Sequence, residues 1–141
     1  MRTTLLWIVG VGLLMLGTGP VLAHHSFAAE FDANKPVSLT GTVTKMEWVN
    51  PHSWIYIDVK KPDGAMETWA IEGGSPNTLL RRGLRKSDLA TGTVIKVTGF
   101  QAKDAGLRAN GKDITLADGR ELFLGSSGTG APTDPESGNK K

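Results

Sequence analysis

Apolar and polar residues alternate with a period of two along the middle of the chain, which is typical of β-strands. In the clearest segment, 54–59, Ile55 and Ile57 fall on one face of the predicted strand. Trp54 and Tyr56 fall on the opposite face. The other strands that the pattern predicts are 39–49, 66–72, 93–100, 113–116 and 121–124.

The pattern changes after the third predicted strand. Ser75 and Pro76 are favoured at the N-cap and at the first position of a helix, and Gly83 is favoured just after its end. We therefore expect a short helix of about two turns between the third and fourth strands. Residues 27–36 are expected to form an irregular lead-in, and the polar segment 101–111 is expected to form a loop.

The order of these elements indicates the fold. Three strands, a short helix and then further strands follow one another as they do in an OB-fold. We therefore predict a mainly β protein, a small OB-fold-like Greek-key barrel with one short helix between its third and fourth strands. A β-sandwich is the alternative, but it leaves the helix unexplained. In an OB-fold the connection between the first two strands borders the usual binding face, and here that connection is residues 50–53.

The first 23 residues have the features of a secretory signal peptide. Arg2 supplies a positive charge, the segment 5–16 is almost entirely apolar, and Val21 and Ala23 are small residues at the −3 and −1 positions. The apolar run is short for a membrane span of ~20 residues, and no basic stop-transfer cluster follows it. We therefore expect cleavage after Ala23, a periplasmic or secreted protein, and no stable membrane span after cleavage.

Length and composition limit the number of domains and the kinds of site that the mature protein can have. Residues 24–124 suffice for one barrel domain, and 125–141 consist largely of small and polar residues, which predicts a disordered C-terminal tail. The chain has no cysteine, so neither a disulfide nor a thiolate site can form. The formal net charge of +2 gives no reason to expect a nucleic-acid partner.

The 3 histidines of the chain fall into two short motifs. Cleavage after Ala23 leaves His24 at the N-terminus, followed by His25, whereas His52 follows Pro51 in a turn. A free amine with adjacent imidazoles suits Cu(II), and zinc is the main competitor. The pattern predicts a copper or zinc site at His24, His25 and His52. Under the alternative interpretation, the imidazoles bind backbone groups and attach the lead-in segment to the barrel.

Aromatic residues gather around the same turn. Trp48 precedes it, and Trp54 and Tyr56 follow it on one face of a strand. An outward face of this kind can stack a sugar or another planar ligand, and the candidate ligand-binding residues are Trp48, Asn50, Trp54 and Tyr56. The alternative is that these rings cover the end of the barrel, as packed aromatic residues usually do.

Four short segments of the chain stand out together: 24–27 (HHSF), 40–43 (TGTV), 48–52 (WVNPH) and 71–77 (IEGGSPN). They resemble those of a family of small exported bacterial proteins, the domain of unknown function 6152. The resemblance covers essentially the whole mature domain. It implies export and a barrel-like fold, and it supplies no activity, substrate or cofactor.

No motif indicates an enzyme. No serine lies in a nucleophile elbow, and the carboxylates on or near strands show no spacing that marks an acid–base pair; they are Glu47, Asp58, Glu67 and Glu72. We therefore expect a binding protein that takes copper or zinc and does not catalyse. One alternative is a module that binds an unknown periplasmic protein or small ligand through its aromatic face, without metal. Another is a purely structural envelope protein.

Overall fold

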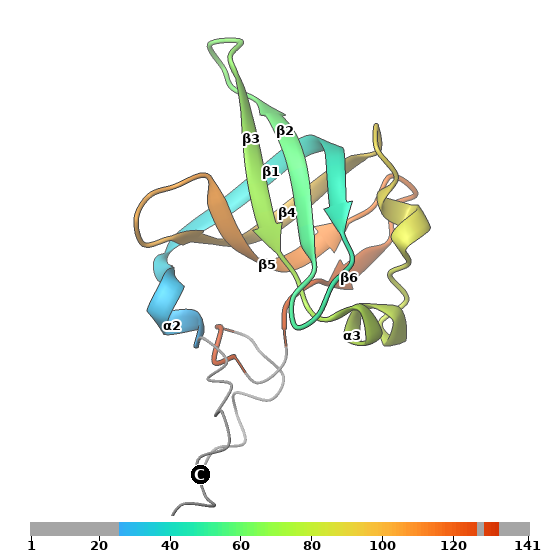
Figure 1. Cartoon of the computed structure of the whole chain (residues 1–141). Helices are drawn as coiled ribbons and strands as arrows, with labels where there is room; N and C mark the ends of the chain where they lie inside the picture. The colour runs from blue at the N-terminus through green and yellow to red at the C-terminus, as the bar shows by residue number, and fades with distance from the viewer. Residues whose placement is uncertain (1–25, 127–128, 133–141) are drawn as a thin grey trace, which may run out of the picture.

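The protein is a mainly β structure, shown in Figure 1 as a computed structural model that describes residues 26–126 and 129–132. Its strands are β1 (Phe31–Glu47), β2 (Trp54–Lys60), β3 (Met66–Glu72), β4 (Val94–Ala102), β5 (Arg108–Thr115) and β6 (Glu121–Phe123). Its helices are α2 (Phe27–Glu30), α3 (Pro76–Arg81) and the 3₁₀-helix η1 (Lys86–Leu89). Within these residues the six strands form one sheet in the order β3-β2-β1-β4-β5-β6, with all neighbours antiparallel. β3 also pairs with β5, in parallel.

The residues that alternate along the strands form one hydrophobic core. Ile55 and Ile57 on β2 and Ile71 on β3 are completely buried. Trp54 and Tyr56, on the other face of β2, remain partly exposed. The predicted division of this strand into an aliphatic inner face and an aromatic outer face is therefore confirmed. Each buried aliphatic side chain stabilises the fold by about 1.5–3 kcal/mol. Other buried members of this core are Val43, Trp69, Leu79, Leu84, Leu89, Ile95, Val97, Ala109, Ile114, Leu116 and Leu124.

A second cluster attaches the beginning of the described chain to the sheet. Phe27 and Phe31 are 5% and 3% exposed, and they pack with Phe100 and Ala131. The ring centroids of Phe27 and Phe100 lie 5.4 Å apart in an edge-to-face arrangement. The Phe27 backbone N–H donates to the Thr129 carbonyl at 3.0 Å, so α2 lies beside the end of the described chain (Figure 1).

β1 begins earlier than its sequence predicts. The expectation of an irregular lead-in over 27–36 is wrong, because this segment contains α2 and the first residues of β1. Phe31 pairs with Ala102 of β4, and regular pairing resumes at Pro36 after an irregularity in register. The beginning of β1 contains mainly polar residues and a proline, so it shows no alternation of apolar and polar positions. Its partner on β4 lies far along the chain.

The predicted loop over 101–111 is also wrong in part, since β4 continues to Ala102 and β5 starts at Arg108. The parallel neighbour explains the early start of β5: Ala70 on β3 pairs with Arg108, and Glu72 pairs with Asn110. These pairings link β1, β2, β3, β5 and β4 in succession, and β4 pairs back to β1.

Two glycines allow β4 and β5 to approach closely. Gly99 pairs with Gly111 across these strands, where the register shifts between Thr98 and Gly99. A Cβ atom on Gly99 would overlap the carbonyl oxygen of Asn110, and one on Gly111 would lie 2.6 Å from the Leu124 side chain. The close contact of these strands therefore requires residues without a side chain.

α3 begins and ends at residues suited to a short helix. The Ser75 side chain accepts a hydrogen bond from the Thr78 backbone N–H at 3.4 Å, and Pro76 follows at the first helical position. Gly83 has a φ of 89°, a conformation that glycine adopts at little cost.

Replacement of Gly99 by alanine is predicted to lower the free energy of unfolding by about 1–3 kcal/mol, because the new methyl group forces the β5 backbone away. Urea unfolding measures this difference. Gly106→Ala is the matched control, since its Cβ would meet only the side chain of Asp104, at 3.0 Å, which is exposed and can move. Equal losses of stability in the two variants would contradict the structural role given to Gly99.

Candidate functional site

The turn that carries His52 is held against the end of β3. The Asn50–Pro51 peptide bond is cis. After it, the Ser53 N–H donates to the Gly74 carbonyl at 3.1 Å, and the Gly73 N–H donates to the Ser53 carbonyl at 2.8 Å. These bonds extend the β2–β3 pairing past the ends of the strands. They place the turn between β1 and β2 at the end of the sheet where α2 and α3 also lie (Figure 1).

His52 is held through one of its ring nitrogens. Its Nδ1 lies 2.9 Å from Ser126 Oγ and 3.4 Å from Glu72 Oε1. The Ser126 hydroxyl also lies 3.3 Å from the Gly73 carbonyl, to which it can donate. The tautomer of the ring decides whether Nδ1 donates to Ser126 Oγ or accepts from it.

Glu72 is a buried carboxyl group on the outer face of β3. It follows the core residue Ile71 and is only 7% exposed, and the Asn110 side chain donates to its Oε1 at 3.5 Å. Burial raises the pKa of Glu72 to about 7, and the negative charge of Glu30 adds to this rise. The Asn110 hydrogen bond and the positive charge of Arg108 act in the opposite direction. Glu72 therefore changes its protonation near neutral pH.

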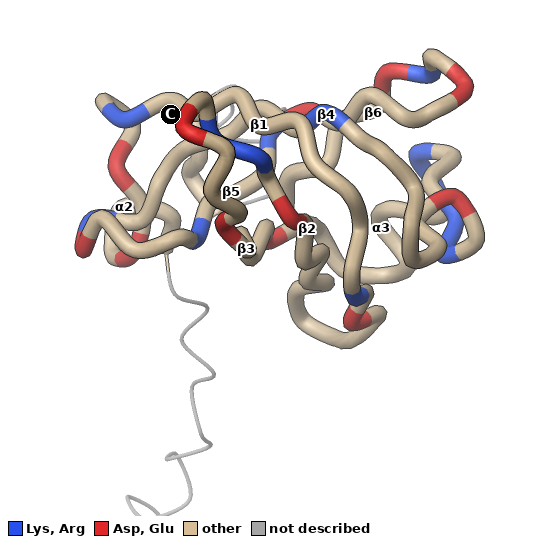
Figure 2. The backbone as a smooth tube through the Cα atoms, turned by 90° about the horizontal axis from the view of Figure 1, so that it is seen from above, with Lys and Arg blue, Asp and Glu red and all other residues tan. Residues whose placement is uncertain are grey.

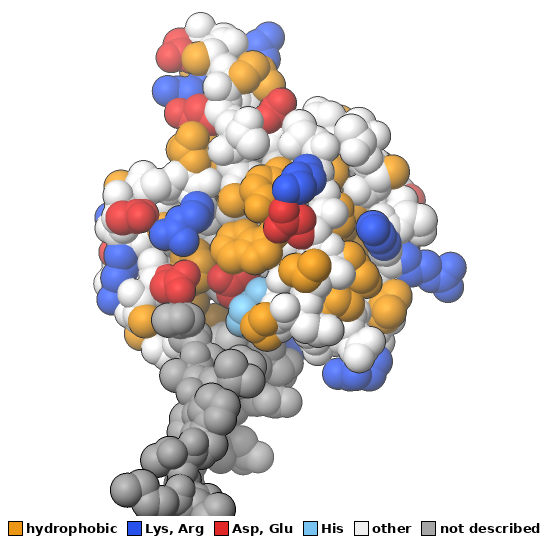
Figure 3. Space-filling model, in the orientation of Figure 1, with side chains coloured by type: hydrophobic (Ala, Val, Ile, Leu, Met, Phe, Trp, Pro, Cys, Tyr) orange, Lys and Arg blue, Asp and Glu red, His pale blue; other side chains and the backbone are white. Residues whose placement is uncertain are grey.

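The aromatic residues of β2 adjoin this pair. Trp54 lies directly across from Glu72 in the β2–β3 register. The Tyr56 hydroxyl donates to Glu47 Oε2 at 3.4 Å, and the Lys45 ammonium lies 5.1 Å from the centre of the Tyr56 ring. Figure 3 shows hydrophobic side chains in the middle of this face, with charged side chains beside them. An aromatic surface and an imidazole–carboxyl pair are thus neighbours on one face.

The other two candidate ligand residues lie differently. Trp48 is partly buried and packs against the hydrophobic core, whereas Asn50 is exposed in the turn. The four residues predicted to bind a ligand therefore do not all contribute to the outer face of β2.

Of the three predicted metal ligands, the structure describes only His52. His24 and His25 lie outside the described residues, as does the predicted signal segment 1–23. Within 26–126 and 129–132, no group of three or more histidine, cysteine, aspartate or glutamate side chains is arranged to hold a metal ion. His52 and Glu72 are a pair of potential ligands.

The combination of Ser126, His52 and Glu72 is not a catalytic triad. In such a triad the serine and the acid contact opposite nitrogens of the imidazole, so that one nitrogen takes the serine proton while the other is held. Here both contact Nδ1. The arrangement orients the ring and lacks the division of roles between the two nitrogens that a triad requires.

Sequence reasoning missed three members of this cluster. Glu72 was one of several strand carboxylates without a marked partner, and Asn110 fell in the predicted loop. Ser126 fell in the predicted tail, where Ser126 is buried and Ala131 is only 6% exposed. Most of the predicted tail lies outside the described residues. Side chains of consecutive strand residues point to opposite faces of the sheet. Because Ile71 points into the core, this alternation was the one local signal that Glu72 points outward.

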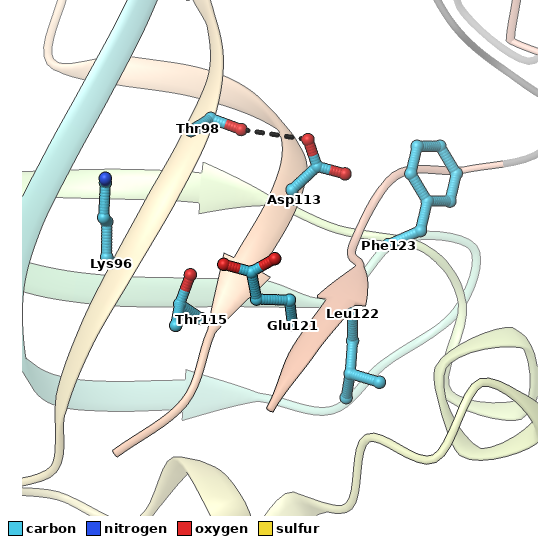
Figure 4. Close-up of a pocket in the computed structure, with 7 residues that line it drawn as sticks. All are labelled: Lys96, Thr98, Asp113, Thr115, Glu121, Leu122 and Phe123. Carbon is cyan, nitrogen blue, oxygen red and sulfur yellow. Dashed lines mark hydrogen bonds between the residues drawn. The ribbon is translucent and has the colours of Figure 1, made fainter. Parts of the chain in front are cut away.

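A shallow hollow of about 290 Å³ lies elsewhere, on the outer side of β4, β5 and β6 (Figure 4). The Thr98 hydroxyl donates to Asp113 Oδ2 across it at 3.3 Å. Its lining mixes both charges with hydroxyl and apolar groups and does not indicate one kind of ligand; it consists of Lys96, Thr98, Asp113, Thr115, Glu121, Leu122 and Phe123.

Basic and acidic residues are interspersed along the backbone (Figure 2). Several form ion pairs, among them Arg120 with Asp88 at 2.8 Å and with Asp118 at 2.7 Å. These pairs are largely exposed and contribute little to stability.

Comparison with known proteins identifies the family of this small β protein. Residues 13–111 of the 141 match the family model described as Family of unknown function (DUF6152). The chain belongs to this family, which confirms the resemblance seen in its motifs. Neither a search of curated proteins nor a search of solved structures gave a match. Among the described residues, no helix has the length and apolar character needed to cross a membrane.

The raised pKa of Glu72 predicts a loss of stability as the pH rises. The ordinary pKa of this group is 4.5, so the folded protein binds the proton more tightly than the unfolded chain between that value and about 7. In this window the free energy of unfolding falls with rising pH, by at most about 3 kcal/mol. Glu72→Gln should remove this part of the slope, as measured by urea unfolding of metal-free protein.

Glu47→Gln is the control for this measurement, because Glu47 lies on the same face and its pKa is lowered by its bond with Lys45. It should keep the wild-type slope across this window. A slope that is the same in wild-type protein and in Glu72→Gln would contradict the assignment.

Proposed function

We propose that the protein is an exported, non-catalytic binding protein that takes copper, or zinc, after cleavage following Ala23. In one arrangement the ligands are the amine and Nδ1 of His24 with the imidazole of His52. In the alternative, the terminal amine, the His25 amide nitrogen and the His25 imidazole form the chelate. Export to the periplasm or to the outside of the cell is supported by the signal features of residues 1–23.

One observation carries this proposal: a chain of contacts leads from the N-terminal segment to His52. The Phe27 N–H donates to the Thr129 carbonyl at 3.0 Å, and the Thr129 hydroxyl donates to the Ser126 carbonyl at 3.5 Å. The Ser126 hydroxyl in turn contacts His52 Nδ1 at 2.9 Å. His24 precedes Phe27 by three residues, which span at most ~11 Å, and this chain of contacts from Phe27 to His52 supports the proposal.

The chemistry of the donors favours Cu(II). A terminal amine and neutral imidazoles form a nitrogen-rich set, which suits the tetragonal geometry of Cu(II), and this ion has the highest affinity among the common divalent metals. Zinc accepts the same ligands, with water in its fourth position. Because imidazole must be neutral to bind, the affinity falls as the pH drops below ~6.5.

We also propose that the domain, residues 24–124, is an OB-fold-like Greek-key barrel. The succession of pairings β1–β2–β3–β5–β4, with β4 paired back to β1, supports it. So does the place of α3 in the chain, between β3 and β4. In such a fold the turn before β2 borders the usual binding face, which is where His52 lies.

The second candidate function is binding of a planar or sugar-like ligand without metal. The outward position of Trp54 and Tyr56 beside Glu72 favours it. Because Lys45 already lies over the Tyr56 ring, Trp54 is the larger free stacking surface of the two.

Titration of the mature protein with Cu(II) and Zn(II) tests the metal site. Protein that starts at His24 should bind one ion. One extra residue before His24 should weaken binding by more than about 100-fold, because it removes the amine from the chelate, a larger change than the loss of an outer-shell partner. Isothermal calorimetry measures both affinities.

Two variants sharpen this test. His52→Gln should weaken binding, whereas Lys96→Gln, in the hollow on β4, β5 and β6, should leave metal affinity unchanged. If the extended protein binds as tightly as the mature one, the N-terminal site is wrong. If His52→Gln has no effect, His52 is not a ligand.

A further inference from the structure

We propose that residues 80–86, which join α3 to η1, form a surface that binds an anionic lipid membrane. The side chains that contact the lipid are those of Leu80, Arg81, Arg85 and Lys86, and we call these four residues the basic surface. The inference goes beyond the proposed function, because the basic surface shares no residue with the predicted metal ligands.

The basic surface is held in place by the core beneath it. Leu79 and Leu84 are 0% and 1% exposed, and Leu89 at the end of η1 is 1% exposed. The Leu84 N–H donates to the Leu79 carbonyl at 3.0 Å, which turns the chain back after α3. These buried side chains fix the backbone of the segment, while the side chains of the basic surface remain in solvent. Figure 1 shows α3 on the other side of the molecule from α2.

The positive charges of the basic surface have no acidic partner. Arg81, Arg85 and Lys86 are all exposed, and none of them forms an ion pair within residues 26–126 and 129–132. Arg82 differs from them, since its guanidinium lies 4.5 Å from the centre of the Phe123 ring. Figure 2 shows basic positions gathered beside α3. Three such charges within one short segment create a local field that attracts anions.

Two acidic residues next to the basic surface are occupied by another cation. Arg120 pairs with Asp88 at 2.8 Å and with Asp118 at 2.7 Å. The same guanidinium donates to the Gly83 carbonyl at 3.2 Å, which holds this group against the segment. Arg120 compensates one of the two negative charges, so the segment keeps an excess of positive charge.

An exposed apolar side chain among these charges favours a lipid over a nucleic acid. Leu80 is 49% exposed, although its neighbour Leu79 in the same helix is completely buried. An apolar side chain between cations can enter the boundary between headgroups and acyl chains while the cations bind the phosphates. Binding of single-stranded nucleic acid relies instead on stacking rings, and the basic surface contains none. The partner that fits this combination is an anionic phospholipid surface.

Vesicle binding tests the inference on metal-free protein that starts at His24, so that the apolar segment 5–16 is absent. Vesicles of phosphatidylcholine and phosphatidylglycerol in equal parts should bind about 100-fold more tightly than vesicles of phosphatidylcholine alone, because each of three basic residues contributes about five-fold at an anionic surface. Binding should also weaken sharply from ~0.1 M to ~1 M salt, since the screening length falls from ~10 Å to ~3 Å. Cosedimentation measures these affinities.

A double variant tests the charges. Arg85→Gln combined with Lys86→Gln should weaken binding to the anionic vesicles about 25-fold, and the fold should be retained because neither side chain takes part in an ion pair of the described structure. The matched control combines Lys35→Gln with Lys60→Gln. It removes the same net charge from two exposed residues, one in the first part of β1 and one at the end of β2, and should leave the affinity nearly unchanged.

Leu80→Gln tests the apolar contact, because it keeps every charge of the basic surface. It should weaken binding to the anionic vesicles about five-fold, since about half of the leucine side chain is available to enter the lipid. Urea unfolding of each variant shows whether the fold is retained.

Four results would overturn the inference. They are equal binding of wild-type protein to both kinds of vesicle, binding to neither, equal losses in the two double variants, and tighter binding to duplex DNA than to the anionic vesicles. An unchanged affinity in Leu80→Gln would reduce the basic surface to a general anion-binding patch and overturn the choice of lipid. None of these results bears on the metal titration, so failure of this inference and failure of the proposed function are distinguishable.

Discussion

The parallel pairing of β3 with β5 is the contact on which the candidate site depends. Glu72 points away from the core, and a carboxyl group in that position on an edge strand would be hydrated. The register with β5 places Asn110 beside it instead and leaves Glu72 only 7% exposed. This close approach is made possible by Gly111, whose Cβ would lie 3.0 Å from the Ile71 side chain. The unusual protonation of Glu72 thus follows from strand packing.

Segments that are far apart in the chain meet at the end of the sheet where this site lies. Backbone hydrogen bonds join Ser53 to Gly73 and Gly74, and the Gly74 N–H donates to the Leu124 carbonyl at 2.9 Å. Leu124 leads directly to Ser126, which contacts His52. Backbone pairing, which does not depend on the identity of the side chains, therefore brings imidazole, carboxyl and hydroxyl groups together.

Local sequence patterns correctly predicted the features that depend on neighbouring residues, namely the two faces of β2 and the turn before it. Alternation separated the buried Ile55 and Ile57 from the outward Trp54, and the turn signal placed His52 between two strands. The start of β5 at Arg108 could not be predicted in this way, because it depends on a partner strand distant in the chain. Glu72 had no special sequence signal for the same reason, since its burial is created by other segments. Ser126 lay in a segment whose composition is typical of disorder.

The central claim is that the processed N-terminus and His52 bind one metal ion together. Electron paramagnetic resonance of the Cu(II) complex tests it most directly, because coupling to nitrogen reports how many nitrogen ligands the ion has. The account predicts one nitrogen fewer in His52→Gln than in mature wild-type protein. Identical nitrogen coupling in the two proteins would contradict it.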